Sequence, residues 1–252
     1  MNQNFRTRLA KLPEIFPFRE LYRHEMDCQI VHWSWCTRMK ASGYLIEWDG
    51  AVVGYGIVDR QWEKGTLNEF YVVPEFRRGA LPMFREVLRV SKARAIRTQT
   101  NDRLLMVMLY DCGDDIRPTV NLFEDAVTTR LTCPGATFRK TIKGEKIFKH
   151  HREPVGDWVL EVGGKVVATG GAFFHYNPPY GDVYMEVEKG ERGKGYGSFL
   201  VQEVKRVCYG MGKLLGARCN RENVASRRTL EKAGFEICGK VLRGKVERSG
   251  KK

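Results

Sequence analysis

The sequence lacks the long hydrophobic runs that would place it in a membrane. Hydrophobic residues make up 42% of the 252 residues, and no stretch approaches the roughly 18 consecutive apolar residues that a spanning helix requires. Residues 1–8 also lack the apolar core of a secretory signal peptide. The seven cysteines are odd in number and scattered, with no C-x-x-C pair, so they indicate neither a disulfide framework nor a zinc site. These absences predict a cytoplasmic protein with no membrane contact and no bound metal.

Positive charge is concentrated in the second half of the chain. The net charge is +13; residues 1–135 contain 19 Lys/Arg and 17 Asp/Glu, whereas residues 136–252 contain 24 and 13. An excess of basic residues suits an anionic ligand. It would also suit nucleic acid, but no recognisable DNA- or RNA-binding motif accompanies it, so nucleic acid is not the partner that we expect.

The most informative segment starts at Val187. It contains Arg192-Gly193-Lys194-Gly195-Tyr196-Gly197-Ser198, followed by an amphipathic run to Cys208. Alternate glycines allow a turn whose amides face one point, and the next helix directs its unpaired N–H groups and positive dipole end to the same point. The segment therefore predicts a diphosphate site. The spacings G-x-x-x-x-G-K-[ST] and G-x-G-x-x-G, which mark two other kinds of phosphate site, do not fit it.

The glycine loop and a later segment together resemble the GNAT acetyltransferase superfamily. The loop fits that superfamily's acyl-CoA motif [RQ]-x-x-G-x-G, and the run from Asn223 to Phe235 fits its later helix, N-x-x-S-x-x-x-L-E-K-x-G-F. The resemblance covers roughly residues 44–112 and 155–242. It implies an N-acetyltransferase that uses acetyl-CoA as cosubstrate, with direct attack by a primary amine and no acyl-enzyme. The acceptor would be a small molecule or a peptide.

An internal repeat explains the length of the chain. A hairpin of two strands is predicted around Gly50 and again around Gly164, and Arg78-Gly79 and Arg192-Gly193 follow at the same offset of 114 residues. We expect an α/β (α+β) fold of two tandem GNAT folds, each a mixed, mostly antiparallel twisted sheet flanked by helices. The predicted parts are a degenerate N-terminal domain (1–140), a linker (141–154) and a C-terminal acetyl-CoA-binding domain (155–252). The oligomeric state stays open, although a duplication that mimics a dimer is compatible with a monomer.

The two copies differ at the loop. Where the second copy has Lys194 to Gly197, the first has Ala80-Leu81-Pro82-Met83. Pro82 removes an amide, and Leu81 adds bulk where a phosphate would lie. We therefore expect the second copy alone to bind acetyl-CoA.

The resemblance also implies which residues hold the cofactor. The loop would contact the diphosphate, the strand ending at Val187 would pair with the pantetheine arm, and Asn223 would reach the cofactor from the later helix. Asn223 is equally a good helix N-cap, and the two roles are compatible. The whole set is Val187, Arg192, Gly193, Lys194, Gly195, Tyr196, Gly197, Ser198, Asn223 and Arg227.

Candidates for proton transfer are Glu186, His175 and Ser226. Leu230 replaces the family's common tyrosine acid, and resemblance to the ribosomal-protein alanine acetyltransferase branch makes Ser226 the candidate acid instead. Glu186 lies in an otherwise apolar strand, where a carboxylate needs either a structural partner or a function, and both alternatives stay open. Asp182 shares its strand face by alternation.

The loop from Phe174 to Gly181 is rich in aromatic residues and proline and would border the acceptor cleft. His175, within it, is the alternative base. The predicted acceptor-binding residues are Tyr176, Asn177, Tyr180 and, from the following strand, Tyr184.

Two other functions remain as alternatives. A non-catalytic CoA-binding regulatory module is favoured by the missing tyrosine and by Val183, which occupies the family's usual base position. A nucleic-acid-binding protein would rest on charge alone. The sequence does not identify the amine acceptor.

Overall fold

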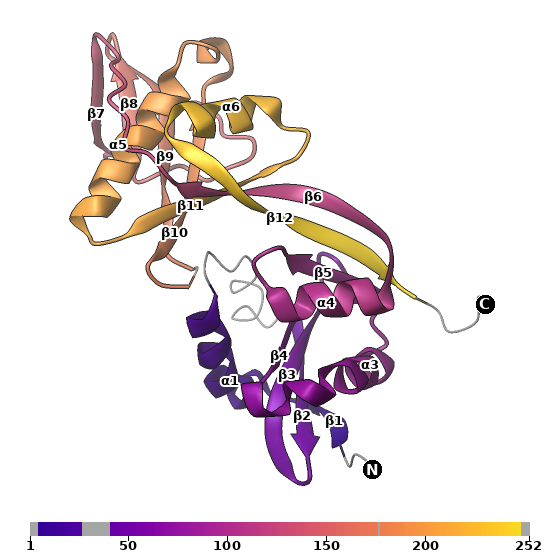
Figure 1. The fold of residues 1–252 in the computed structure, drawn as a ribbon. Helices are drawn as coiled ribbons and strands as arrows, with labels where there is room; N and C mark the ends of the chain where they lie inside the picture. The colour runs from indigo at the N-terminus through magenta and orange to yellow at the C-terminus, as the bar shows by residue number, and fades with distance from the viewer. Residues whose placement is uncertain (1–4, 27–40, 176, 248–252) are drawn as a thin grey trace. The chain divides into compact units, whose positions relative to one another are not determined.

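The computed structural model describes residues 5–26, 41–175 and 177–247. Figure 1 shows two compact units, one formed by residues 1–120 and 239–252 and the other by residues 121–238. Each unit is a mixed, mostly antiparallel sheet with helices packed on it, as the sequence predicted. Among the described residues, no helix is long and apolar enough to cross a membrane.

The first unit has a sheet with helices on both faces. In spatial order its strands are β1 (Phe5–Ala10), β2 (Ala41–Trp48), β3 (Ala51–Asp59), β4 (Thr66–Val72), β5 (Ala95–Gln99) and the last part of β12 (Phe235–Val246). β4 and β5 are parallel, and the other pairs are antiparallel. The apolar residues of α1 (Leu12–Glu25) pack on one face, and those of α3 (Ala80–Ser91) and α4 (Arg103–Cys112) pack on the other. The 3-10 turn η1 (Pro74–Gly79) leads into α3.

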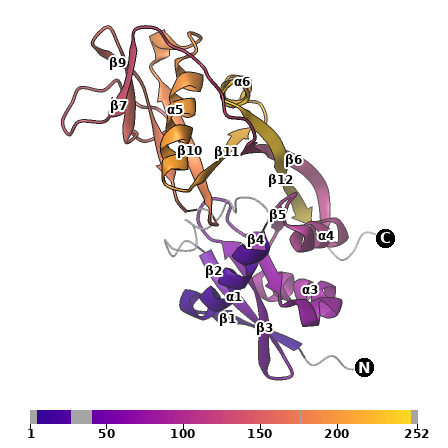
Figure 2. The same ribbon diagram turned by 60° about the vertical axis from the view of Figure 1, so that its left-hand side comes forward.

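The second unit has its helices on one face of the sheet. In spatial order its strands are the last part of β6 (Gly113–Asp125), β11 (Leu214–Asn220), β10 (Tyr180–Val187), β9 (Lys165–Phe173), β8 (Trp158–Val162) and β7 (Ala136–Lys140). α5 (Tyr196–Gly210) packs on β9 and β10 (Figure 2). Together with α6 (Val224–Lys232) it buries Val201, Val204 and Leu230 against Val183 of β10. The turn η2 (Lys189–Glu191) precedes α5. The amphipathic run to Cys208 that the sequence predicted forms most of α5.

The internal repeat is visible in the backbone. Both hairpins carry a β-bulge at the same place, between Ile46 and Glu47 in one and between Leu160 and Glu161 in the other. Both turns consist of two residues with positive φ, Asp49-Gly50 and Gly163-Gly164, as two-residue hairpin turns require. The offset of 114 residues therefore relates equivalent positions of two similar hairpins.

Side-chain contacts extend the repeat to β1 and β7. In each copy one arginine joins two glutamates: Arg8 with Glu14 and Glu47, and Arg139 with Glu145 and Glu161. The arginines are 131 positions apart, whereas the hairpins are 114 apart. The first copy therefore has 17 more residues between these points, in the stretch that contains α1.

The segment 141–154, predicted to be a linker, lies inside the second unit. β7 pairs with β8 from Ala136 to Lys140, so these residues belong to the second sheet. The segment after β7 occupies the position in the repeat that α1 has in the first copy, and it contains no helix or strand.

Candidate active site of the second unit

The parallel strands β10 and β11 are paired along only part of their length. Tyr180 to Asp182 are opposite Leu214 to Gly216, and the pairing ends there. β10 stays paired with β9 on its other side up to Val187. The edge of β10 from Val183 to Val187 therefore faces an opening in the sheet, where an extended ligand with amide groups can pair with the backbone.

The glycine loop joins the end of β10 to α5. Gly193 and Gly195 have φ values of +83° and +87°, in the left-handed region that favours glycine. Gly195 is the N-cap of α5 and supplies no side-chain cap, so the first amides of this helix are available to an anionic ligand. Arg192 Nε donates a hydrogen bond to the Val187 carbonyl oxygen at 3.2 Å, which joins the loop to the strand.

Cationic side chains surround this loop. Arg192 and Lys194 are exposed, and Lys194 pairs with Glu191 at 2.7 Å. Lys232, which the sequence analysis did not assign, places its Nζ 3.7 Å from the point that a Cβ on Gly195 would occupy. Lys232 lies in the L-E-K-x-G-F motif, but that motif does not show its distance from the loop. The uncapped helix and these cations together suit a diphosphate.

The corresponding turn of the first unit has a different backbone. η1 continues directly into α3, and Gly79 has a φ of −100°. A Cβ on Gly79 would lie 2.5 Å from the ring of Trp48, and that ring packs against Phe76 with centroids 5.7 Å apart. Side chains therefore cover this turn, and Pro82 removes one amide from the first turn of α3.

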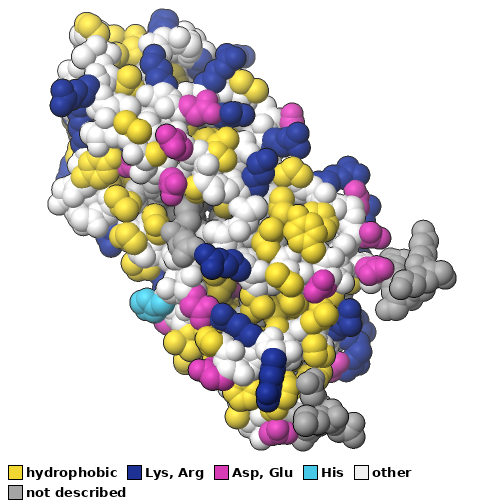
Figure 3. Space-filling view, in the orientation of Figure 1, with side chains coloured by type: hydrophobic (Ala, Val, Ile, Leu, Met, Phe, Trp, Pro, Cys, Tyr) yellow, Lys and Arg dark blue, Asp and Glu magenta, His cyan; other side chains and the backbone are white. Residues whose placement is uncertain are grey.

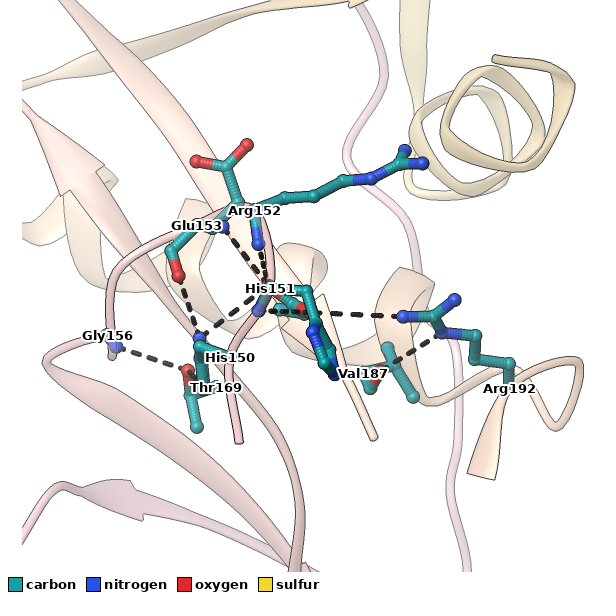
Figure 4. Close-up of polar contacts among 9 residues, drawn as sticks. His150, His151, Arg152, Glu153, Gly156, Thr169, Val187 and Arg192 are labelled. Atoms are coloured by element: carbon teal, nitrogen blue, oxygen red, sulfur yellow. Dashed lines mark hydrogen bonds and ion pairs between the residues drawn. The ribbon is translucent and has the colours of Figure 1, made fainter. Parts of the chain in front are cut away.

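Glu186 holds the segment that replaces α1 in the second copy, and Figure 4 shows His150 to Glu153 of that segment. Its carboxylate accepts backbone N–H groups from His151, Arg152 and Glu153 at 3.0–3.2 Å. Burial raises the pKa of Glu186, but these N–H groups and the nearby His150 outweigh it and leave the pKa below its ordinary value. Of the two alternatives for Glu186, these contacts favour a structural partner.

His150 completes the same attachment. One ring nitrogen, Nδ1, lies 2.9 Å from the Glu153 carbonyl oxygen, and the other, Nε2, lies 3.2 Å from the Thr169 hydroxyl. Gly156 N–H also donates to Thr169. Among the described residues, no group of three or more His, Cys, Asp or Glu side chains is arranged to hold a metal.

His175 and Asp182 meet where β10 and β11 separate. His175 Nε2 lies 3.3 Å from Asp182 Oδ2, and Arg218 of β11 approaches the same oxygen at 3.5 Å. Asp182 is buried and is the last residue of β10 that pairs with β11. The structure thus brings together the alternative base and a carboxylate that can orient it.

Glu153 is a second carboxylate near this cluster that the sequence analysis missed. Partial burial, followed by the negative charges of Asp182 and Glu186, raises its pKa, while Arg218 and Arg152 act in the opposite direction. The sequence around Glu153 is polar and rich in lysine, so it gave no indication that this residue lies near the site. Its position depends on the hydrogen bond that the Glu153 N–H group donates to Glu186.

Three of the other predicted residues lie at the start of α6. Asn223 is the N-cap of α6 and accepts the Ser226 N–H at 3.1 Å, which agrees with its capping role. Ser226 lies beside Cys219, which belongs to the buried cluster formed with α5 and α6. Arg227 pairs with Glu231 at 2.7 Å.

The residues predicted to bind the acceptor are not all in one environment. Tyr184 stacks on Phe173 with ring centroids 4.2 Å apart. Asn177 is buried, and its carbonyl oxygen accepts the Tyr180 N–H at the start of β10. Tyr176 lies outside the described residues.

Known proteins share this fold. Residues 123–235 match the family model of the acetyltransferase (GNAT) family. An acetyltransferase of the GNAT family from Colwellia psychrerythraea has a TM-score of 0.77 at 13% identity, over 96% of this chain and 100% of its own. The tandem GNAT protein from the clavulanic acid biosynthesis pathway has a TM-score of 0.61 at 10% identity, over 98% and 100%. No curated protein gives a significant match in sequence.

The chain contains the GNAT fold twice in tandem, and its second copy matches the model of the GNAT acetyltransferase family. The matched residues include the glycine loop and α6, the two segments that carry the resemblance predicted from the sequence. The resemblance and the fold class predicted from the sequence are thereby confirmed.

Proposed function

We propose that this protein is an N-acetyltransferase that moves an acetyl group from acetyl-CoA to a primary amine of a small molecule or peptide. The observation that carries the proposal is the opening between β10 and β11 beside the uncapped start of α5. It provides an unpaired strand edge and a cluster of helix amides next to each other. A cosubstrate with an amide-containing arm and a diphosphate requires both.

The residues that would hold acetyl-CoA all belong to the second unit. The amides from Gly193 to Ser198, with Arg192, Lys194 and Lys232, would bind the diphosphate. The edge of β10 up to Val187 would bind the pantetheine amides, and Asn223 and Arg227 would contact the arm from α6. The bound thioester supplies an activated acetyl group and a thiol leaving group. The closed turn of the first unit supports one cofactor site per chain.

His175 would take the proton from the amine, because an amine attacks only in its neutral form. Asp182 would orient the imidazole. Glu186 would hold the His150–Glu153 segment beside this cluster rather than act as the base. Ser226, on α6, would give a proton to the departing thiolate and so release the free thiol.

The experiment is thiol release from acetyl-CoA across a panel of amines. With a good acceptor, His175→Gln should lower kcat by about 10²-fold and leave acetyl-CoA affinity unchanged, a usual scale for loss of a general base. His151→Gln is the matched control, because its side chain is exposed and its backbone N–H keeps the bond to Glu186. Equal turnover in the two variants would remove His175 from the mechanism.

A CoA-binding module without turnover is the second candidate. It is favoured by Leu230, which replaces the family's tyrosine and is buried in the core under α6. Tight acetyl-CoA binding without thiol release to any amine would establish it. Nucleic-acid binding has less support, because Lys and Arg are interspersed with Asp and Glu on the face seen in Figure 3.

A further inference from the structure

The first unit contains a cavity of about 240 Å³. It lies between the last turn of α1, the end of β4 and the start of α4. Its polar wall includes two acidic residues, Glu25 and Asp102, and two arginines, Arg77 and Arg103. The side chains of Phe70 and Tyr71 from β4 add an aromatic wall.

This cavity occupies the place that corresponds to the cofactor opening of the second unit. β4 and β5 are paired only at Thr66–Leu67 and Ala95–Ile96, so they also separate. Arg77 Nε donates to the Val72 carbonyl oxygen as Arg192 does to Val187, and in both cases the two residues are five positions apart. The opening is thus retained, whereas the turn that would hold a diphosphate is covered. A ligand of this cavity must therefore be smaller than acetyl-CoA and need no diphosphate site.

Asp102 gives the cavity an unusual charge. It caps α4 by accepting the Leu105 N–H at 3.0 Å, and it accepts the Tyr22 hydroxyl at 2.9 Å. The residue is 2% exposed, and burial raises its pKa to about 6. The equivalent cap of α6 is the neutral Asn223, which shows that a cap here needs no charge. A buried carboxylate beside a cavity is accounted for if it receives a cation.

The side-chain amide of Asn101, next to Asp102, has hydrogen-bonding groups that a ligand could use. Both polar atoms of its amide are buried, and neither has a partner within the described ranges. The amide offers one acceptor and two donors at the cavity wall. The start of α4 adds the positive end of a helix dipole. The wall therefore offers groups for a cation and for an anion within a small volume.

We propose that the cavity binds a zwitterion of amino-acid size. Its ammonium group would lie beside Asp102 and the Asn101 oxygen. Its carboxylate would face the Asn101 nitrogen, the start of α4 and Arg77. Glu25 keeps Arg77 in place through a 2.5 Å ion pair and also accepts the Tyr71 hydroxyl at 2.7 Å. The two carboxylates and two guanidinium groups leave the wall neutral overall, as a zwitterion requires.

The test is thermal unfolding and calorimetric titration of the full chain with the standard free L-amino acids at millimolar concentration. At least one should raise the transition of the first unit by several degrees, and Asn101→Leu should weaken its binding at least tenfold. Asp102→Asn, which keeps the cap, should also weaken binding. Gly195→Leu in the second unit is the control, because it should lose acetyl-CoA and keep the amino acid.

Two further measurements decide the charge assignment. Binding of the amino acid should tighten as pH rises through about 6, because the ionised Asp102 pairs with the ammonium group. Tyr22, Glu69 and Arg77 are the titratable or charged groups that also act on the pKa of Asp102. This pH dependence should disappear in Asp102→Asn. Butylamine and butyrate, each with one of the two charges, should bind at least tenfold more weakly. The proposal is overturned if no amino acid shifts the transition, if Asn101→Leu binds normally, or if either singly charged probe binds equally well.

Discussion

Glu186→Gln separates the two roles considered for this residue. The carboxylate is 6% exposed and accepts three backbone N–H groups. Glutamine keeps one acceptor oxygen, removes the charge and turns an NH2 group toward at least one of the donors. Hydrogen bonds to a charged acceptor are worth about 1 kcal/mol more than neutral ones, and an orphaned donor adds about 1 kcal/mol or more. We expect the free energy of unfolding of the second unit to fall by about 2–3 kcal/mol.

This loss should lower the melting temperature by about 5–10 °C at pH 7, measured by circular dichroism. The pKa of Glu186 lies below its ordinary value of 4.5, so its stabilisation is complete above that pH and is lost as pH falls through the lowered pKa. The difference between wild type and variant should therefore shrink in acid. Glu188→Gln is the matched control: its carboxylate pairs with the exposed Lys165, and such a pair contributes about 1 kcal/mol or less.

Turnover completes the test. If Glu186 holds the His150–Glu153 segment, the variant should lose stability and keep kcat within about tenfold of wild type. A variant with an unchanged melting temperature and a kcat lowered by about 10²-fold would refute the structural role and identify Glu186 as the proton acceptor.

Three further predictions concern the glycine loop and the first unit. Gly195→Leu should weaken acetyl-CoA binding at least 10²-fold in calorimetry, because a side chain at φ +87° strains the loop, whereas Gly190→Leu, in open space, should bind normally. Wild type should show one acetyl-CoA site per chain, and two equivalent sites would contradict this. Asp102→Asn should stabilise the first unit by about 2 kcal/mol at pH 7.5, by about half of that at pH 5 and little at about pH 3.5, because a carboxyl pKa raised from 3.8 to about 6 makes stability fall as pH rises between these two values. An equal effect at all three pH values would argue against it. Arg19→Met should lower the free energy of unfolding, measured with urea, by about 3–5 kcal/mol, because it leaves the Glu69 carboxylate buried without its cationic partner. Adding Glu69→Leu should recover most of this loss, whereas a single variant as stable as wild type would contradict the prediction.

The sequence alone determined the features that depend on neighbouring residues. The Asp49-Gly50 turn, the left-handed glycines of the loop and the N-cap Asn223 follow from backbone preferences that act within a few positions. The buried face of α5 follows from helical periodicity. Because these features are local, a motif read from the printed sequence was sufficient to predict the family and the fold of the second unit.

Tertiary structure decided the features that join distant residues. Lys205 lies in the middle of α5, where its sequence position gives no sign of burial, yet it is 1% exposed because Asp125 and two carbonyl oxygens receive its ammonium group. Glu186 finds its donors about 35 positions earlier in the chain. Such partners are fixed by which strands pair and in what register, and pairing energies are shared among many residues.

The repeat shows the same division. The constant offset of 114 residues was readable because both hairpins kept their turns. The correspondence between Arg8 and Arg139 could not be read from the sequence, because these two residues are 131 positions apart rather than 114. The first copy has additional residues there, in the stretch that contains α1. That relation became visible only when β7 was found paired with β8. A sequence pattern records spacing along the chain, whereas the position of β7 depends on hydrogen bonds to a strand that lies beyond an irregular segment.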